Sequence, residues 1–188
     1  MSIPSMIFLA VLALIGFGAM AIYNRLVALR RNCDQASSDI DVQLRQRHDL
    51  VPNLVEVVKG YASHERGTLE DVMKARAAAT SAPAGAAQAQ AEAAFTGAIG
   101  RLMAVAEAYP DLKASANFSS LQDELSDIEN KIAAARRYLN AAVNEYNVSR
   151  EQFPANLMAN TFGFMARDVT VIAQEERATM QVAPAVHF

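Results

Sequence analysis

The sequence of 188 residues contains no tryptophan and only one cysteine, Cys33. A single cysteine excludes an intramolecular disulfide and a metal cluster built from the thiolates of this chain alone. Eight glycines and six prolines supply few turns, which argues against an architecture of many β-strands. Hydrophobic residues make up 52% of the chain, but aromatic residues make up only 7%. Much of the apolar content is alanine. Alanine favours helices and fills narrow seams between them, so the composition predicts an all-α protein.

Basic residues are too few and too scattered to form a stripe. The chain carries 17 basic and 20 acidic residues, which gives a net charge of −3. Surfaces that bind nucleic acid are usually basic, so this balance argues against a nucleic-acid partner.

Charged side chains are absent from the N-terminal segment, and the first one is Arg25. The apolar run from Ile3 to Ile22 has 20 residues, which as an α-helix span about 30 Å, the thickness of the hydrocarbon core of a bilayer. This length predicts a transmembrane anchor at residues 1–24. A cleaved signal peptide is the alternative, since residues 19–21 read AMA. The N-terminus, however, lacks a basic residue and the apolar run exceeds the usual signal length.

The basic residues nearest the apolar run all follow it, at Arg25, Arg30 and Arg31. By the positive-inside rule, this asymmetry predicts the orientation of a single pass through the inner membrane. The N-terminus is expected outside and the main domain in the cytoplasm. The lipid bilayer is therefore one expected partner.

The remainder predicts an antiparallel bundle of about four long helices at residues 25–167, followed by a C-terminal extension at 168–188. Apolar residues recur at nearly 3.5-residue intervals in the first bundle helix, at 24–61, where Pro52 is expected to kink or break the helix. Arg47 lies between apolar positions of this helix. We expect it to snorkel or to pair with an acidic residue of a neighbouring helix.

Three further helices are expected, two of them with capping boxes at their starts. The second begins near Thr68, the third covers about 88–108 and ends at the Tyr-Pro-Asp of 109–111, and the fourth begins at Ser119 and closes or kinks at Pro154. The sequence of residues 168–180 is compatible with either a helix or a short strand. The fourth helix carries an apolar seam with alternating steps of four and three, which demands a long partner helix: Leu121, Leu125, Ile128, Ile132, Ala135, Leu139, Ala142 and Tyr146.

Long motifs give the chain a recognisable resemblance. They read YNRLVALRRN (23–32), SDIDVQLRQRHDLVPNLVEVVKGYASHE (38–65), AEAYPDLKASANFSSLQDEL (106–125), IENKIAAARRYLNAAVNEYN (128–147), FPANLMANTFGF (153–164) and APAVHF (183–188). On these motifs the sequence resembles the LemA family over nearly all of the chain after the anchor. The resemblance implies a bacterial, single-spanning protein with an antiparallel bundle of long helices. One branch of the family is associated with magnetosome membranes, which implies membrane-organising work.

Residues suited to chemistry are few. The chain has three histidines, His48, His64 and His187, and the sequence from His64 onward lacks the second histidine of a zinc-protease motif. Asp34, Asp39, Asp41 and Asp49 could together hold a cation, but arginines interspersed among them favour a salt-bridged helix face. We therefore predict no catalytic residue, no cofactor, no metal and no small-molecule substrate.

The best candidate for a partner contact is the segment 153–164, which carries Phe153, Leu157, Phe162 and Phe164. These side chains could instead fold back and close the core. The sequence thus predicts a membrane-tethered scaffold that associates with itself or with another protein. The alternatives are a sensor or adaptor whose helices shift about Pro52, and a hydrolase that uses His64 with Glu65 or Glu70.

Overall fold

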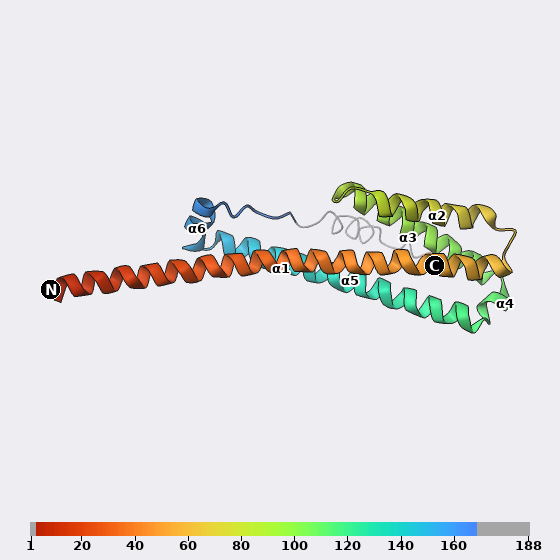
Figure 1. Ribbon diagram of the computed structural model, residues 1–188, viewed down its shortest axis with the longest axis horizontal. Coiled ribbons are helices and arrows are strands. Elements are labelled where there is room, and N and C mark those ends of the chain that lie inside the picture. The colour runs from red at the N-terminus through yellow and green to blue at the C-terminus, as the bar shows by residue number, and fades with distance from the viewer. Residues whose placement is uncertain (1–2, 169–188) are drawn as a thin grey trace, which may run out of the picture. The chain divides into compact units, whose positions relative to one another are not determined.

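The computed structural model describes residues 3–168, and all of the regular structure in that range is helical. The helices are α1 (Ile3–Tyr61), α2 (Arg66–Ser81), α3 (Ala86–Glu107), α4 (Pro110–Lys113), α5 (Ala116–Glu151) and α6 (Ala155–Phe162) (Figure 1). The all-α prediction is confirmed, with two short helices added to the expected four. The helix or strand predicted at 168–180 lies, after its first residue, outside the described residues.

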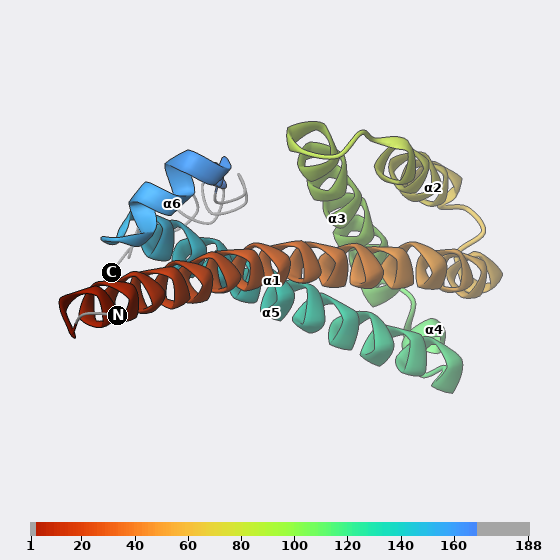
Figure 2. The same ribbon diagram turned by 60° about the vertical axis from the view of Figure 1, so that its left-hand side comes forward.

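The chain forms two compact units, and α1 and α5 each contribute to both. Within the described range, unit 1 contains residues 3–39 and 135–168, and unit 2 contains residues 40–134. Each unit buries the helix faces that the apolar spacing predicts. In unit 2, α2 and α3 lie side by side (Figure 2).

The predicted apolar seam of α5 is buried. Its large members Leu125, Ile128, Ile132, Leu139 and Tyr146 are all less than 10% exposed, and its flanks carry charged side chains such as Lys131 and Glu145. In unit 1, the seam is matched on α1 by Leu26, Cys33 and Ala36, which follow steps of seven and three. The hydrophobic effect therefore assembles each unit from long helices with one apolar stripe.

Of the kink or break predicted at Pro52, the break is wrong, because α1 continues through this proline to Tyr61. Proline lacks an N–H, so it cannot donate to the carbonyl four residues earlier, which belongs to His48. The guanidinium of Arg76 on α2 supplies the missing donor, with its Nε 2.5 Å from the His48 carbonyl oxygen. The buried acceptor is thus satisfied by a neighbouring helix, and the helix has no need to end there.

Both predicted capping boxes are also wrong. Helix α2 begins at Arg66, before Thr68, and its N-cap residue Glu65 makes no side-chain hydrogen bond to the helix. Helix α5 begins at Ala116, so Ser119 lies inside the helix. The predicted stop after the third helix is confirmed, since α3 ends at Glu107 and Pro110 then occupies the first position of α4, where its missing N–H costs little.

Candidate functional site

Unit 2 contains a buried polar cluster centred on Arg47. Arg47 is 1% exposed. It lies among apolar positions of α1, on the helix face that packs inward. Its Nη1 donates to Glu129 Oε1 at 2.8 Å and to Thr96 Oγ1 at 3.0 Å, and its Nη2 donates to Glu92 Oε2. The predicted pairing of Arg47 with acidic residues of neighbouring helices is confirmed, and it joins α1 to α3 and α5.

His48 completes this cluster from the next position of α1. Its Nε2 lies 3.0 Å from Glu92 Oε1, and both side chains are buried. The rings of His48 and Phe95 lie 5.3 Å apart, so the imidazole packs against an apolar wall of α3. A cavity of about 370 Å³ opens beside the cluster, and Asp41, Thr80 and Gln88 contribute to its lining. Glu92 therefore has a cationic guanidinium on one oxygen and an imidazole on the other.

The electrostatics of Glu92 favour its charged form. Burial alone raises the pKa of this carboxyl group, but the contact with His48 and the positive charge of Arg47 outweigh burial and hold the pKa of Glu92 below its ordinary value of 4.5. A carboxylate with a depressed pKa stabilises the folded state at pH values above the unfolded pKa, and this stabilisation is lost as the pH falls through the folded pKa.

We therefore expect Glu92→Gln to change how the stability of the protein depends on acid. The gap in the free energy of unfolding between the parent and Glu92→Gln should be widest above about pH 4.5 and should narrow as the pH falls below that value. Urea unfolding of both proteins at about pH 6 and about pH 3.5 measures this gap. Glu56, which is exposed and pairs with Lys59 at 3.1 Å, provides the control Glu56→Gln. An equal gap at both pH values for Glu92→Gln would show that this carboxyl group titrates alike in the folded and unfolded chains.

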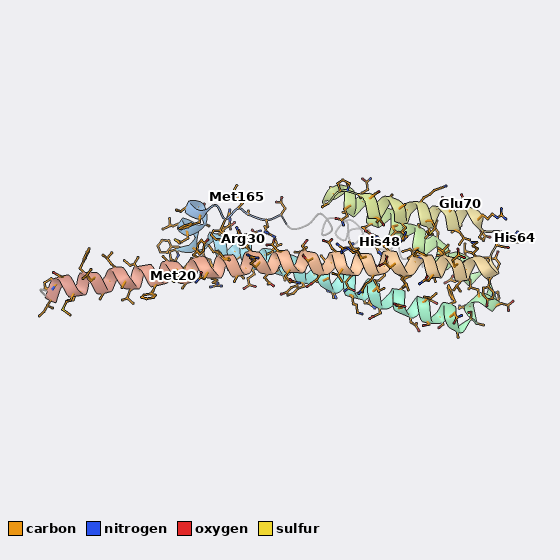
Figure 3. The ribbon with its side chains drawn as sticks, viewed as in Figure 1. Met20, Arg30, His48, His64, Glu70 and Met165 are labelled. Carbon is orange, nitrogen blue, oxygen red and sulfur yellow. The ribbon has the colours of Figure 1, made fainter. Side chains whose placement is uncertain are left out.

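The other histidines and the acidic residues do not join this cluster. His64 lies exposed in the turn between α1 and α2 (Figure 3), and His187 lies outside the described residues. Asp34, Asp39, Asp41 and Asp49 are all exposed. Asp34 pairs with Arg167 at 2.5 Å and Asp49 lies 4.0 Å from Arg76. Within residues 3–168, no three His, Cys, Asp or Glu side chains converge on a point where a metal ion could bind.

Unit 1 holds the segment predicted as a partner contact, at α6 and its flanks. Phe164 is 4% exposed, whereas Phe153, Leu157 and Phe162 are 80%, 58% and 56% exposed. The alternative of folding back into the core is thus correct for Phe164, and the other three side chains face outward. A role of these side chains in partner contact stays a prediction.

An aromatic cluster fixes α6 against α1. The ring of Tyr23 meets Phe162 at 5.2 Å and Phe164 at 5.6 Å, both edge to face, which is a favourable arrangement for aromatic pairs. The guanidinium of Arg30 lies 5.2 Å from the Phe164 ring centre, within range of a cation–π contact. Gly163, at φ 69°, ends α6 in the left-handed region, and this turn lets Phe164 enter the core while Phe162 stays at the surface.

Hydrogen bonds hold the chain after α6 in place. Tyr146 donates its hydroxyl to the carbonyl oxygen of Met165 at 2.9 Å. Asn147 both donates to and accepts from the backbone of Arg167, at 2.7 and 3.0 Å. These two residues of α5 therefore fix the segment that carries Phe164, and sequence patterns alone gave no signal for this role.

A groove of about 440 Å³ in unit 2 lies between the end of α1 and α2. Val55, Leu69 and Met73 are its apolar lining residues, and Glu56 and Arg66 are among its charged ones. A groove of this composition can hold an apolar side chain of another molecule.

The apolar part of α1 lies uncovered in unit 1. Its large side chains from Ile3 to Met20 are 48% exposed or more, and α1 is the one helix among the described residues that is long and apolar enough to cross a membrane. Exposure of so much contiguous apolar surface to water is unfavourable. Together with the comparisons below, it indicates a membrane-associated protein.

Comparison with known proteins gives relatives and a family. The chain is 26% identical to magnetosome proteins MamQ 1 and MamQ 2 of Paramagnetospirillum magneticum over 86% of its length and 70% of theirs. It is also 26% identical to magnetosome protein MamQ of Magnetospirillum gryphiswaldense, over 85% of its length and 69% of that protein. Residues 36–188 match the LemA family. This match covers most of the chain, and the protein therefore belongs to the LemA family.

Proposed function

We propose that the protein is a non-enzymatic, membrane-anchored scaffold that associates with copies of itself. The observation that carries this proposal is the continuity of α1, which passes from the exposed apolar segment into the packed part of unit 1 as one uninterrupted helix. A flexible linker would let a folded domain turn freely above the membrane. A helix instead holds unit 1 in a fixed orientation to the segment in the bilayer, which suits a protein that presents surfaces to neighbours.

Confinement to a membrane makes weak contacts sufficient for assembly. Chains held at the same surface meet at a high effective concentration, so association needs no large interface. The groove lined by Val55, Leu69 and Met73 supports the capacity of unit 2 for such contacts. The arginines that follow the apolar segment support an orientation with the N-terminus outside and the two units in the cytoplasm.

The surroundings of the residues invoked for a hydrolase support a non-enzymatic role. His64 is exposed in a turn, and Glu70 is exposed and lies 3.7 Å from Lys74. The buried Glu92 contacts both Arg47 and His48, which are also buried. Their geometry is that of a structural ion-pair cluster, in which removal of one partner leaves a buried charge uncompensated.

Disulfide crosslinking in isolated membranes tests self-association, and the single native cysteine supplies the control. Cys33 is completely buried, and burial raises the pKa of its thiol, so the parent should form no disulfide-linked dimer. Val148→Cys in unit 1 and Val42→Cys in unit 2 introduce thiols at positions that are about half exposed.

We expect a mild oxidant to link copies of at least one of these two variants and to leave the parent unlinked. The linked species should have the mass of two chains. Monomeric parent protein in mild detergent, together with no linked species from either variant in membranes, would contradict the proposal.

A further inference from the structure

A charge-free stretch of the chain surrounds α6. Residues 152–166 contain no Asp, Glu, Lys or Arg, although such residues make up 20% of the whole sequence. In a segment that faces water, charged side chains are normally frequent. Their absence is explained if the segment is buried in the protein or if it lies against another apolar medium.

Burial in the protein accounts for only one side of this segment. Ala159 and Phe164 are buried, but the large apolar side chains Phe153 and Met165 are 80% and 77% exposed. Leu157 and Phe162, which are more than half exposed, lie between them in the sequence. Four large apolar groups thus stay more than half exposed within 13 consecutive residues, 153–165, so the described chain covers α6 and its flanks only in part.

The position of α6 in unit 1 identifies the medium on that side. Tyr23, the residue directly after the apolar run, contacts Phe162 and Phe164. Phe153 lines a cavity of about 120 Å³ together with Ile22 and Arg25 of α1. The segment 153–164 therefore lies beside the point of α1 where apolar residues give way to arginines (Figure 3). In a helix that crosses a bilayer, this is the depth at which the hydrocarbon meets the headgroups.

Charge at this depth also favours a lipid surface. Between Ile3 and Asn32 of α1 the only charged side chains are Arg25, Arg30 and Arg31, and all three are exposed. Arginine side chains at the end of a membrane helix bind the phosphate groups of lipids. The closest acidic residue along α1, Asp34, is paired with Arg167, so this pairing reduces its repulsion of an anionic headgroup.

We propose that α6 is an interfacial helix that rests on the membrane at the end of the α1 span, with Phe153, Leu157, Phe162 and Met165 inserted among the lipid acyl chains. The helix is short, uncharged and fixed to α1 by aromatic contacts, so insertion requires little further ordering. Apolar side chains at the boundary between headgroups and hydrocarbon stabilise such shallow contacts. This inference depends on the insertion of α1 in lipid, which the proposed function also requires, but not on self-association.

The absence of tryptophan from the chain allows a direct test with single-tryptophan variants of the full-length protein. Leu157→Trp and Phe153→Trp report on the proposed contact. Phe17→Trp, within the apolar segment, reports on the span, and Tyr138→Trp reports on an exposed site of unit 1 whose hydroxyl contacts Asn32. Each variant is reconstituted in vesicles of phosphatidylcholine and phosphatidylglycerol, with and without bromine on the acyl chains, since bromine quenches tryptophan on contact.

The expected loss of fluorescence is greatest for Phe17→Trp, clear for Leu157→Trp and Phe153→Trp, and least for Tyr138→Trp. One outcome would overturn the interfacial helix and leave the anchor intact. In that outcome Phe17→Trp is quenched, but Leu157→Trp and Phe153→Trp are quenched no more strongly than Tyr138→Trp. Emission from α6 that is shifted to the blue but unquenched would overturn it in favour of a protein partner. Lack of quenching at Phe17→Trp would overturn the membrane anchor itself.

Discussion

Replacing Arg47 with methionine is expected to lower the free energy of unfolding by about 3 to 5 kcal/mol. Arg47 is almost completely buried, and its guanidinium is the cation that faces the buried Glu92 carboxylate. Methionine has a similar apolar stem, so packing around the stem is largely kept. The Glu92 carboxylate, however, loses its cationic partner. Leaving this buried charge uncompensated costs more free energy than the intact ion pair contributes. Urea unfolding of full-length protein in mild detergent, followed by circular dichroism, measures the loss.

The same helix offers a matched control for this substitution. Arg45 lies two positions before Arg47 and is exposed, so Arg45→Met should change the free energy of unfolding by about 0.5 kcal/mol or less. Adding Glu92→Leu to Arg47→Met should recover much of the lost stability, because no buried carboxylate then remains at that position. Equal unfolding midpoints for Arg47→Met and Arg45→Met would show that the cluster contributes nothing to stability.

Replacing Ile132 with aspartate should have an effect at least as large, about 4 kcal/mol or more. Ile132 is 1% exposed in the apolar seam of α5. The substitution removes a buried apolar side chain and puts a carboxylate in its place, without a designed partner. A charge at this depth is expected to abolish cooperative unfolding in a thermal melt, because the unit then keeps its helices without a fixed core.

Ala134, two residues further along α5, is exposed and gives the comparison Ala134→Asp. This variant adds the same charge to the same helix and should melt close to the parent. If Ile132→Asp melted as the parent does, then the seam would face water and the packing of α5 described above would be wrong.

The periodic apolar faces could be predicted from the sequence because they reflect local geometry. Steps of four and three along α5 place Ile128, Ile132 and Leu139 on one side of any helix, and these residues are buried. Arg47 stood out for the same reason, since a charge at an apolar position needs a partner. Its partners Glu92 and Glu129 lie 45 and 82 positions further along the chain, and no local pattern identifies them.

The error in predicting a break at Pro52 has a physical cause. The prediction assumed that the backbone group left over by a local rule must be satisfied locally. The His48 carbonyl is satisfied instead by Arg76, 28 positions away. A rule based on neighbouring residues therefore marks where a helix is vulnerable, and tertiary contacts decide whether it ends.

In the segment 153–164, the sequence pattern could not show which apolar side chains are buried and which are exposed. Phe162 and Phe164 are separated by one glycine and differ widely in exposure. The difference arises from the positive φ of Gly163 and from the hydrogen bond of the Phe164 N–H to the Ala159 carbonyl at 2.9 Å. A turn of this kind redirects the chain after α6, and apolar periodicity carries no information about it.

If α1 spans a bilayer as proposed above, its unbroken path from Met20 to Asp39 within unit 1 couples the protein to the thickness of that bilayer. A transmembrane helix that is longer than the surrounding hydrocarbon leans over to keep its apolar residues covered. Because one continuous helix forms both the membrane-spanning segment and the packed part of unit 1, a tilt of that segment tilts unit 1 by the same angle. A thinner membrane would incline the attached unit, and a thicker one would bring it upright.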